Sequence, residues 1–206
     1  MSEKDKIILP KPIYKGKLTI EEVLMKRKTI RGFKEEELDE KTISQLLWAL
    51  QGITNIEDKE GKKIYHRAAP SAGKSYSLIA FIAFKKGFFE YNPIKHELLK
   101  IGDKDIRENI ASIANVEYNK EAIIKTPLTL ILVADGNKRP TPIWETAVKF
   151  IYLEAGHATQ NLLLQLAALG LGSITITSFN IQKFYDVTGL GFDKKPIYLL
   201  PIGIPK

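Results

Sequence analysis

The stretch WETAVKFIYLEAGHATQNLLLQLAALGLGSITITSF, residues 144–179, decides the fold. It contains no proline, and its good helix formers predict one helix from Trp144 to Gly170, about 40 Å long at 1.5 Å per residue. The second half of this helix is apolar nearly all round, which is typical of a helix buried on several sides. Gly170 and Gly172 end the helix, and the β-branched run Ile174–Thr177 predicts a buried strand directly after it.

A membrane span is the alternative interpretation of this apolar helix. Its longest uncharged run has sufficient length, but four polar side chains interrupt it at its centre: His157, Gln160, Asn161 and Gln165. Polar groups at that depth in a bilayer are costly. We therefore expect a helix buried in protein, and no association with a membrane.

The composition limits what the rest of the chain can do. Its 206 residues and hydrophobic content of 44% fit one domain, residues 1–206, with a sizeable core. No cysteine is present, which excludes disulfides, thiol chemistry and cysteine-bound metal. The first ten residues lack an apolar signal core, which predicts a cytoplasmic protein. The net charge of +7 could favour nucleic acid, but the lysines are scattered, so we expect solvated faces and no nucleic-acid partner.

A cluster of cations follows the first predicted helix. Residues 1–17 should form an extended arm because Pro10 and Pro12 block a helix. The helix should begin near Thr19, with Glu22 completing a capping box. It ends in Lys26-Arg27-Lys28-Thr29-Ile30-Arg31, which could clamp a phosphate through arginine forks and a hydroxyl donor. A solvated charged face is the alternative interpretation of this run.

The next part of the chain combines a helix with a loop of small residues. Apolar residues at helical spacing predict a helix over Glu37–Gly52, followed by a polar loop over residues 55–63. The segment Ala69-Pro70-Ser71-Ala72-Gly73 would let a backbone approach a ligand closely. Gly73-Lys74-Ser75 resembles the end of a phosphate-binding loop, but Ala68 stands where that motif needs glycine, so we exclude nucleotide triphosphate binding.

The remaining elements alternate between strands and short helices, which predicts an α+β fold. Apolar runs indicate two strands, Leu78–Phe84 and Leu128–Ala134, of which the second is apolar enough to be central in a sheet. Between them in the sequence, a hairpin turns at Asn92-Pro93. The predicted strands are Leu78–Phe84, Gly87–Tyr91, Glu97–Ile101, Leu128–Ala134 and Ile197–Ile202. The predicted helices are Asp103–Ala114, Asn119–Lys125 and Ile181–Thr188, and residues 135–143 should form a loop.

Taken in order, these segments resemble the nitroreductase family of flavin enzymes, and within it the branch related to SagB-type dehydrogenases. Five segments, spread over nearly the whole chain, are similar to family motifs. They are Arg27–Arg31, similar to Arg-Arg-Ser-x-Arg; Leu46–Thr54, similar to Leu-Leu-Trp-Ala-x-Gln-Gly-Ile-Thr; Ala69–Gly73 with Tyr76, matching Ala-Pro-Ser-Ala-Gly; Glu154–Leu162 with Leu169–Gly172, matching the central helix; and Leu200–Gly203, matching the last strand.

The resemblance implies a mixed central sheet flanked by helices, and a homodimer with FMN at the subunit interface and the long helix in the dimer core. The residues that it implies as FMN contacts fall into four groups. They are Arg27, Lys28, Thr29 and Arg31 at the phosphate; Pro70, Ser71, Ala72 and Gly73 from the second subunit; Asn119 on the pyrimidine edge of the ring; and the backbone of Thr177 and Ser178 near N5 and O4. For Asn119, a helix N-cap is the alternative interpretation.

Three features depart from the family pattern. Thr177 and Ser178 stand where the family often has glycine or alanine, and Tyr76-Ser77 replaces the branch's Tyr-Pro. The family often completes the phosphate site with a basic residue beyond the last strand, and here only Lys206 is available for that role.

The implied chemistry belongs to the flavin, so we predict no catalytic side chain. The histidines are too few and too dispersed for a metal site. The resemblance implies a ping-pong reaction in which NAD(P)H reduces flavin N5 and a flat small-molecule acceptor, a nitroaromatic, a quinone or a similar compound, is then reduced on the same ring. The physiological acceptor is open, because acceptor choice depends on variable loops, here about residues 104–118 and 135–145. The choice between NADH and NADPH is open because no Gly-x-Gly-x-x-Gly fingerprint is present.

Three other functions remain as alternatives at this point. One is a SagB-like FMN dehydrogenase that oxidises azoline heterocycles in a modified peptide, and whether it has a cyclodehydratase partner is open. Another is a flavin-binding protein with little turnover. The last is a basic binding module without flavin.

Overall fold

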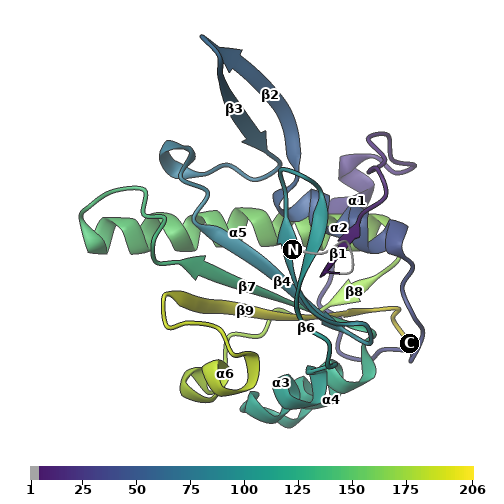
Figure 1. Cartoon of the computed structure of the whole chain (residues 1–206). Coiled ribbons are helices and arrows are strands. Elements are labelled where there is room, and N and C mark those ends of the chain that lie inside the picture. The colour runs from purple at the N-terminus through teal and green to yellow at the C-terminus, as the bar shows by residue number, and fades with distance from the viewer. Residues whose placement is uncertain (1–4) are drawn as a thin grey trace.

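The computed structural model describes residues 5–206, and its centre is a seven-stranded sheet with helices on both faces (Figure 1). Every pairing in this sheet is antiparallel, which confirms the predicted α+β class and makes the sheet antiparallel rather than mixed. From edge to edge the strands are β1 (Lys6–Ile8), β6 (Glu97–Gly102), β5 (Gly87–Asn92), β4 (Leu78–Phe84), β7 (Leu128–Asp135), β9 (Lys194–Gly203) and β8 (Gly172–Ser173).

Strands β4 and β7, at the centre of the sheet, are apolar on both faces. Each face therefore carries a hydrophobic core of its own. In β7, Leu130 and Leu132 point into one core, while Ile131 and Val133 point into the other. The alternation follows from the two-residue period of a strand. A sheet that is covered on both sides needs such continuous apolar runs, and this is why β4 and β7 could be predicted from the sequence.

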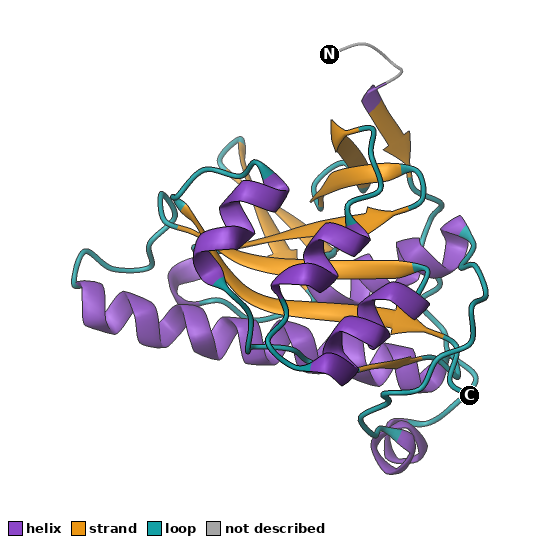
Figure 2. Cartoon of the chain, turned by 90° about the horizontal axis from the view of Figure 1, so that it is seen from below, coloured by secondary structure: helices purple, strands orange, loops and turns teal. Residues whose placement is uncertain are grey.

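Helices cover both faces of the sheet. On one side lie α2 (Glu40–Gln51) and α5 (Trp144–Ala168), with α1 (Ile20–Lys26) packed beside α5. The capping box predicted for α1 is present, with Thr19 and Glu22 bonded to each other's amides at 3.3 and 2.7 Å. The other side, seen in Figure 2, carries α3 (Arg107–Ile113), α4 (Glu117–Lys125) and α6 (Ile181–Thr188).

The long helix α5 ends two residues before its predicted end, but its burial differs from the prediction. Ala155, Ala158 and Leu162 are buried against the sheet. The opposite side is exposed in this chain, at Tyr152, Leu153, Gly156, His157 and Gln160. The helix therefore has more apolar surface than a single chain buries.

The predicted loop at residues 55–63 was wrong, because a two-stranded hairpin occupies this part of the chain. Strands β2 (Ile53–Lys59) and β3 (Lys62–Arg67) pair with each other only and project from the sheet (Figure 1). Glu60 and Gly61 both have positive φ, 54° and 81°, as a tight hairpin turn requires. The hairpin is exposed over most of its length, so it lacks the apolar alternation by which strands are predicted.

The strand predicted at Ile174–Thr177 was also wrong, because pairing occurs two residues earlier. Gly172–Ser173 pair with the end of β9, and within the described residues 174–177 only Ile176 forms a bridge, an isolated one to Leu199. The predicted ribbon of β5 and β6 exists, but it belongs to the main sheet. Part of the predicted arm, residues 6–8, adds to it as β1. Residues 1–4 of that arm lie outside the described residues.

Candidate functional site

The cationic segment after α1 is fixed against the last part of the sheet. The Ile30 amide donates to the Ser173 carbonyl at 3.0 Å, and the Lys206 amide donates to the Gly32 carbonyl at 3.2 Å. Gly172 allows this approach, since a Cβ at that position would lie only 2.5 Å from Cγ1 of Ile30. These contacts bring together three segments that are remote in the sequence.

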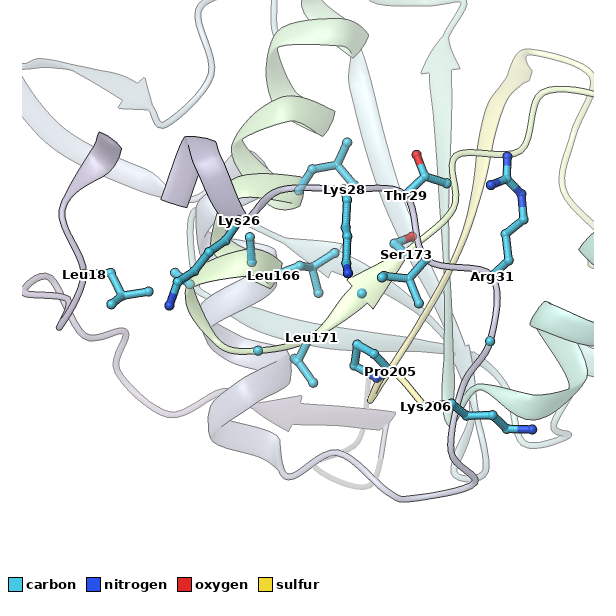
Figure 3. A pocket seen from close by; sticks show the side chains of 17 residues that line it. Leu18, Lys26, Lys28, Thr29, Arg31, Leu166, Leu171, Ser173, Pro205 and Lys206 are labelled. Carbon is cyan, nitrogen blue, oxygen red and sulfur yellow. The ribbon is translucent and has the colours of Figure 1, made fainter. Parts of the chain in front are cut away.

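A pocket of about 550 Å³ lies between this segment, the end of α5, strand β8 and the C-terminus. Apolar walls come from α5, for example Leu166. In Figure 3 the Lys28 side chain lies in the middle of the pocket, with Lys26 and Arg31 on opposite sides of it. The polar residues that line the pocket are Lys26, Lys28, Thr29, Arg31, Ser173 and Lys206.

The pocket carries an unbalanced positive charge. Lys26, Lys28, Arg31 and Lys206 line it, and none of them forms a salt bridge with a carboxylate in the part of the chain that the structure describes. Lysine and arginine with a nearby hydroxyl are the groups that bind phosphate. Of the residues expected at a phosphate, Lys28, Thr29, Arg31 and Lys206 are therefore together, whereas Arg27 does not line the pocket.

A buried amide follows, in the sequence, the tyrosine that lies against the arginine of the pocket. The guanidinium carbon of Arg31 is 5.5 Å from the ring centroid of Tyr118, the residue before Asn119. Asn119 is only 5% exposed, and its Oδ1 has no hydrogen-bond partner in the described chain. Helix α4 begins at Glu117 with Val116 at the N-cap position, so Asn119 is not the N-cap. A buried carbonyl oxygen without a donor costs free energy unless a ligand supplies one.

The backbone segment Thr177–Ser178 lies beside the connection between α3 and α4. The Asn115 amide donates to the Ser178 carbonyl at 3.2 Å, and the Asn115 side chain donates to Ser178 Oγ at 3.1 Å. Asn115 connects α3 to α4, the helix that carries Asn119. Thr177 and Ser178 are exposed, so they can be reached by a molecule that lies across this surface.

The turn Pro70–Gly73 is distant in space from the cationic pocket. Ser71 Oγ donates to Glu154 on α5 at 2.6 Å, whereas the cationic pocket contacts α5 at Leu163 and beyond. Twelve residues of helix, about 18 Å at 1.5 Å per residue, separate Glu154 from Leu166 in the pocket wall. One chain therefore does not bring the turn and the cations together.

Parts of this arrangement were not predicted from the sequence. Lys26 lies in the predicted cationic run but was not expected among the site residues. Gly172 was predicted to end a helix, whereas in the structure the glycine is needed where Ile30 packs. The buried Glu154 and the half-buried Arg67, which both contact the turn, were not predicted to act with it. The signal for Glu154 was a charged side chain in an otherwise apolar stretch, whereas Arg67 follows Lys63 and His66 and had no such signal.

Comparison with known proteins places the chain in a family. The sequence model of the nitroreductase family matches residues 24–204. A protein of Methanocaldococcus jannaschii, provisionally named a nitroreductase, is 26% identical over 90% of this chain and 91% of its own length. The chain belongs to the nitroreductase family, as the sequence motifs predicted, and family membership indicates an oxidoreductase. The SagB-type branch is not distinguished by these matches.

Solved structures share the fold. One from Ralstonia eutropha JMP134, provisionally named a nitroreductase, has a TM-score of 0.80 and 26% identity, and the match covers 98% of this chain and 90% of that one. Another, from Parabacteroides distasonis and provisionally named an NADH dehydrogenase/NAD(P)H nitroreductase, has a TM-score of 0.63 at 17% identity, over 90% and 86% of the two chains. At that identity the second likeness supports the fold alone.

Among residues 5–206, no helix has the length and apolar character needed to span a bilayer. Within the same residues, no group of three or more His, Asp or Glu side chains is placed to hold a metal ion.

Proposed function

We propose that the protein is an FMN-dependent NAD(P)H oxidoreductase that reduces flat small-molecule acceptors, such as nitroaromatics or quinones. The observation that carries this proposal is the pocket in which Lys26, Lys28, Arg31 and Lys206 have no carboxylate partners among residues 5–206. Members of the nitroreductase family generally use FMN with NAD(P)H, and a phosphate is the group that such a pocket would bind. Residues 1–206 would form one FMN-binding domain.

The described residues fit FMN at more than its phosphate end. Lys28, Thr29, Arg31 and Lys206 would bind the phosphate, and the unpartnered Oδ1 of Asn119 would accept from the ring N–H on the pyrimidine edge. Backbone groups of Thr177 and Ser178 would face the ring near N5 and O4. Arg27, outside the pocket wall, would contribute only from the neighbouring surface.

FMN and the side chains around it would have different roles in the reaction. When bound, FMN supplies the hydride chemistry, accepting a hydride from NAD(P)H and delivering it to the acceptor in a ping-pong reaction. The side chains bind and orient, and their cations favour negative charge that develops in the site. No nucleophile or metal is required, so the proposal names no catalytic side chain.

We further propose a homodimer that completes the site. Tyr152, Leu153 and Gly156 form an exposed apolar stripe along α5, and burying such area is the main driving force for association. A glycine in the middle of a helix costs about 1 kcal/mol relative to alanine. At Gly156 a Cβ would meet no atom within 4 Å in this chain, so packing within the chain does not require glycine there. Close approach of a second α5 would require glycine at position 156. The Pro70–Gly73 turn of the second subunit would then reach the FMN.

The proposal is tested by titrating purified, flavin-free protein with FMN and measuring both stoichiometry and molecular mass. We expect one FMN per chain and a mass of two chains. Turnover with NAD(P)H and a quinone or nitroaromatic should then exceed that of free FMN. Absence of FMN binding would overturn the proposal, whereas binding without turnover would favour a flavin-binding protein.

A further inference from the structure

A buried carboxylate contacts the turn that precedes β4. Glu154, on the inner side of α5, is 3% exposed. Its Oε2 accepts from Ser71 Oγ at 2.6 Å and from the Ser77 amide at 3.4 Å. The carboxylate therefore holds the two ends of the segment 71–77, which includes three of the four residues that the proposed function places against FMN from the other subunit and adjoins the fourth.

A half-buried cation holds the same turn from the hairpin side. The Arg67 guanidinium lies 4.4 Å from the ring centroid of Tyr76, and the Arg67 amide donates to Tyr76 Oη at 3.3 Å. Arg67 also donates to Gln51 Oε1 at 2.6 Å. Glu154 and Arg67 have no direct salt bridge in the described chain, so each acts on the turn through separate contacts.

The turn needs such support because its backbone is strained. Gly73, Lys74 and Tyr76 have φ values of 60°, 55° and 46°. A non-glycine residue in this region is disfavoured because its Cβ comes too close to the following carbonyl oxygen, and strain of this kind persists only where the surroundings fix it. Ser71 Oγ accepts from the Tyr76 amide at 2.9 Å, so the hydroxyl that donates to Glu154 also fixes the strained residue.

Stability alone does not explain a carboxylate at this position. Burial raises the pKa of Glu154, against the hydrogen bonds from Ser71 and Ser77 and the charge of Arg67, which lower it. Its Oε1 has no hydrogen-bond partner in the described chain. A buried charge of this kind is often no more stabilising than an apolar side chain of equal volume. An apolar side chain at this position could not accept the hydrogen bond from Ser71.

We propose that Glu154 is a positioning residue: through its hydrogen bond to Ser71 it holds the 71–77 turn in the strained shape in which the turn covers the flavin of the other subunit. This inference rests on the proposed function for the identity of the ligand. The holding of the turn itself is a property of the protein without FMN, and it can be measured separately.

The first measurement is amide hydrogen exchange on the flavin-free protein. Glu154→Met conserves side-chain volume and helix propensity but removes the acceptor. We expect the amides of Tyr76 and Ser77 to exchange at least about tenfold faster in this variant, since each loses a hydrogen bond or the group that orders it. Amides in the centre of β7 should be unchanged. Ser71→Ala, on a half-exposed turn, should release the Tyr76 amide in the same way and serves if the first variant does not fold.

The second measurement is a double-mutant cycle on FMN affinity, because a carboxylate that acts chiefly through Ser71, and only through a longer bond to the Ser77 amide besides, has little effect once Ser71 is gone. Glu154→Met alone should weaken FMN binding by about tenfold. In the Ser71→Ala background the same change should have less than about a twofold effect. The matched control is Thr159→Val, an isosteric change at a buried α5 hydroxyl that has no partner in the described chain. This control should leave exchange and affinity unchanged.

The outcomes separate this inference from the proposed function. Unchanged exchange at Tyr76 and Ser77 would overturn it, whether or not FMN binds. Faster exchange with unchanged FMN affinity, or additive effects in the cycle, would overturn the role toward flavin. Failure of the unaltered protein to bind FMN would overturn the proposed function and the flavin part of the inference together. Faster exchange, weaker binding and non-additivity would support it.

Discussion

The Ile30 amide nitrogen lies 3.0 Å from the Ser173 carbonyl oxygen, and this hydrogen bond joins the cationic segment to strand β8. The two residues belong to segments that are far apart in the chain. Their contact is possible because Gly172, beside Ser173, leaves room for the Ile30 side chain. The position of Lys28, Thr29 and Arg31 around the pocket therefore depends on one glycine at the edge of the sheet.

Replacing that glycine should disturb the pocket without touching its polar groups. In Gly172→Ala the new Cβ would clash with Ile30, so the segment must shift at a cost of about 1–3 kcal/mol of folding stability. FMN affinity should fall by at least about tenfold, because the cations move with Ile30. Denaturant unfolding and FMN titration measure the two effects. Gly102→Ala, where a Cβ meets no atom within 4 Å, is the control, and equal behaviour of the two variants would contradict the account.

Arg31 should matter for FMN through its charge. Arg31→Ala should weaken FMN binding by about 1.5–3 kcal/mol, the scale of a hydrogen bond to a charged group, and the loss should shrink as salt rises. Arg27→Ala should cost less, because Arg27 does not line the pocket. Lys183→Ala removes an exposed cation of α6 and serves as the control. An Arg31→Ala variant with the affinity of this control would exclude Arg31 from the phosphate site.

Asn119 should contribute to binding more than to folding. Its Oδ1 has no partner in the described chain, so Asn119→Ala removes no bond that this oxygen makes within the protein. We expect FMN affinity to fall by about tenfold, the scale of one hydrogen bond with its partner left buried. Isothermal titration with FMN checks this, with the exposed Asn109→Ala on α3 as the control. Full FMN affinity in Asn119→Ala would mean that the ring lies elsewhere.

Gly156 should decide the oligomeric state. In Gly156→Leu the side chain finds open space within one chain, and leucine is a better helix former than glycine, so the subunit should fold. A second α5 packed there would be pushed away, and sedimentation should show monomers that bind FMN weakly. Lys183→Leu places the same side chain on the far helix α6 and should leave the mass unchanged. Dimers of Gly156→Leu with normal FMN affinity would refute the proposed interface.

His96 should make the attachment of the N-terminal segment dependent on pH. Its Nδ1 lies 2.8 Å from Tyr91 Oη and its Nε2 lies 2.7 Å from Ser44 Oγ. Burial lowers the pKa of His96 below its ordinary value of 6.5, although the Pro10 carbonyl acts in the opposite direction. The unfolded chain then binds the proton more readily than the folded one. The stabilisation by neutral His96 is therefore complete above pH 6.5 and is lost as pH falls through the lowered pKa.

The measurement is the free energy of unfolding between pH 7.5 and about pH 5. The loss for one proton cannot exceed about 1.4 kcal/mol per pH unit. His96→Asn removes the titration and keeps a residue that tolerates the positive φ of 51° found there. Its stability should be lower at pH 7.5 but should fall less steeply with acid. An equal slope in both proteins would show that His96 is not the group responsible.

The parts of the fold that the sequence predicted are those with a local cause. Strands β4 and β7 follow from their apolar runs, the start of α1 from the Thr19–Glu22 capping box, and α5 from its composition. The hairpin of β2 and β3 was missed because neither of its faces is buried enough to leave a period of two in the sequence. Exposed pairing of this kind is decided by the turn at Glu60-Gly61.

The candidate site was predicted as a set of residues, and the structure adds how they are distributed. Lys28, Thr29, Arg31 and Lys206 line one pocket, whereas Pro70–Gly73 lie on a separate turn. Contacts such as Ile30 with Ser173 and Glu154 with Ser71 join residues more than eighty positions apart. No local pattern encodes such contacts, so composition and spacing could not predict them. The residues' roles toward FMN stay predictions.

The central claim is tested most directly by the visible absorption spectrum of the purified protein, reconstituted with FMN and freed of excess, followed by anaerobic addition of NADH and then NADPH. The account predicts protein-bound flavin bands that bleach rapidly with at least one of the two nucleotides and return when a quinone or nitroaromatic is added. Bands that persist with both nucleotides would contradict an NAD(P)H-fed reductase and favour another electron donor, such as a modified peptide. A protein that retains no flavin would contradict the account altogether.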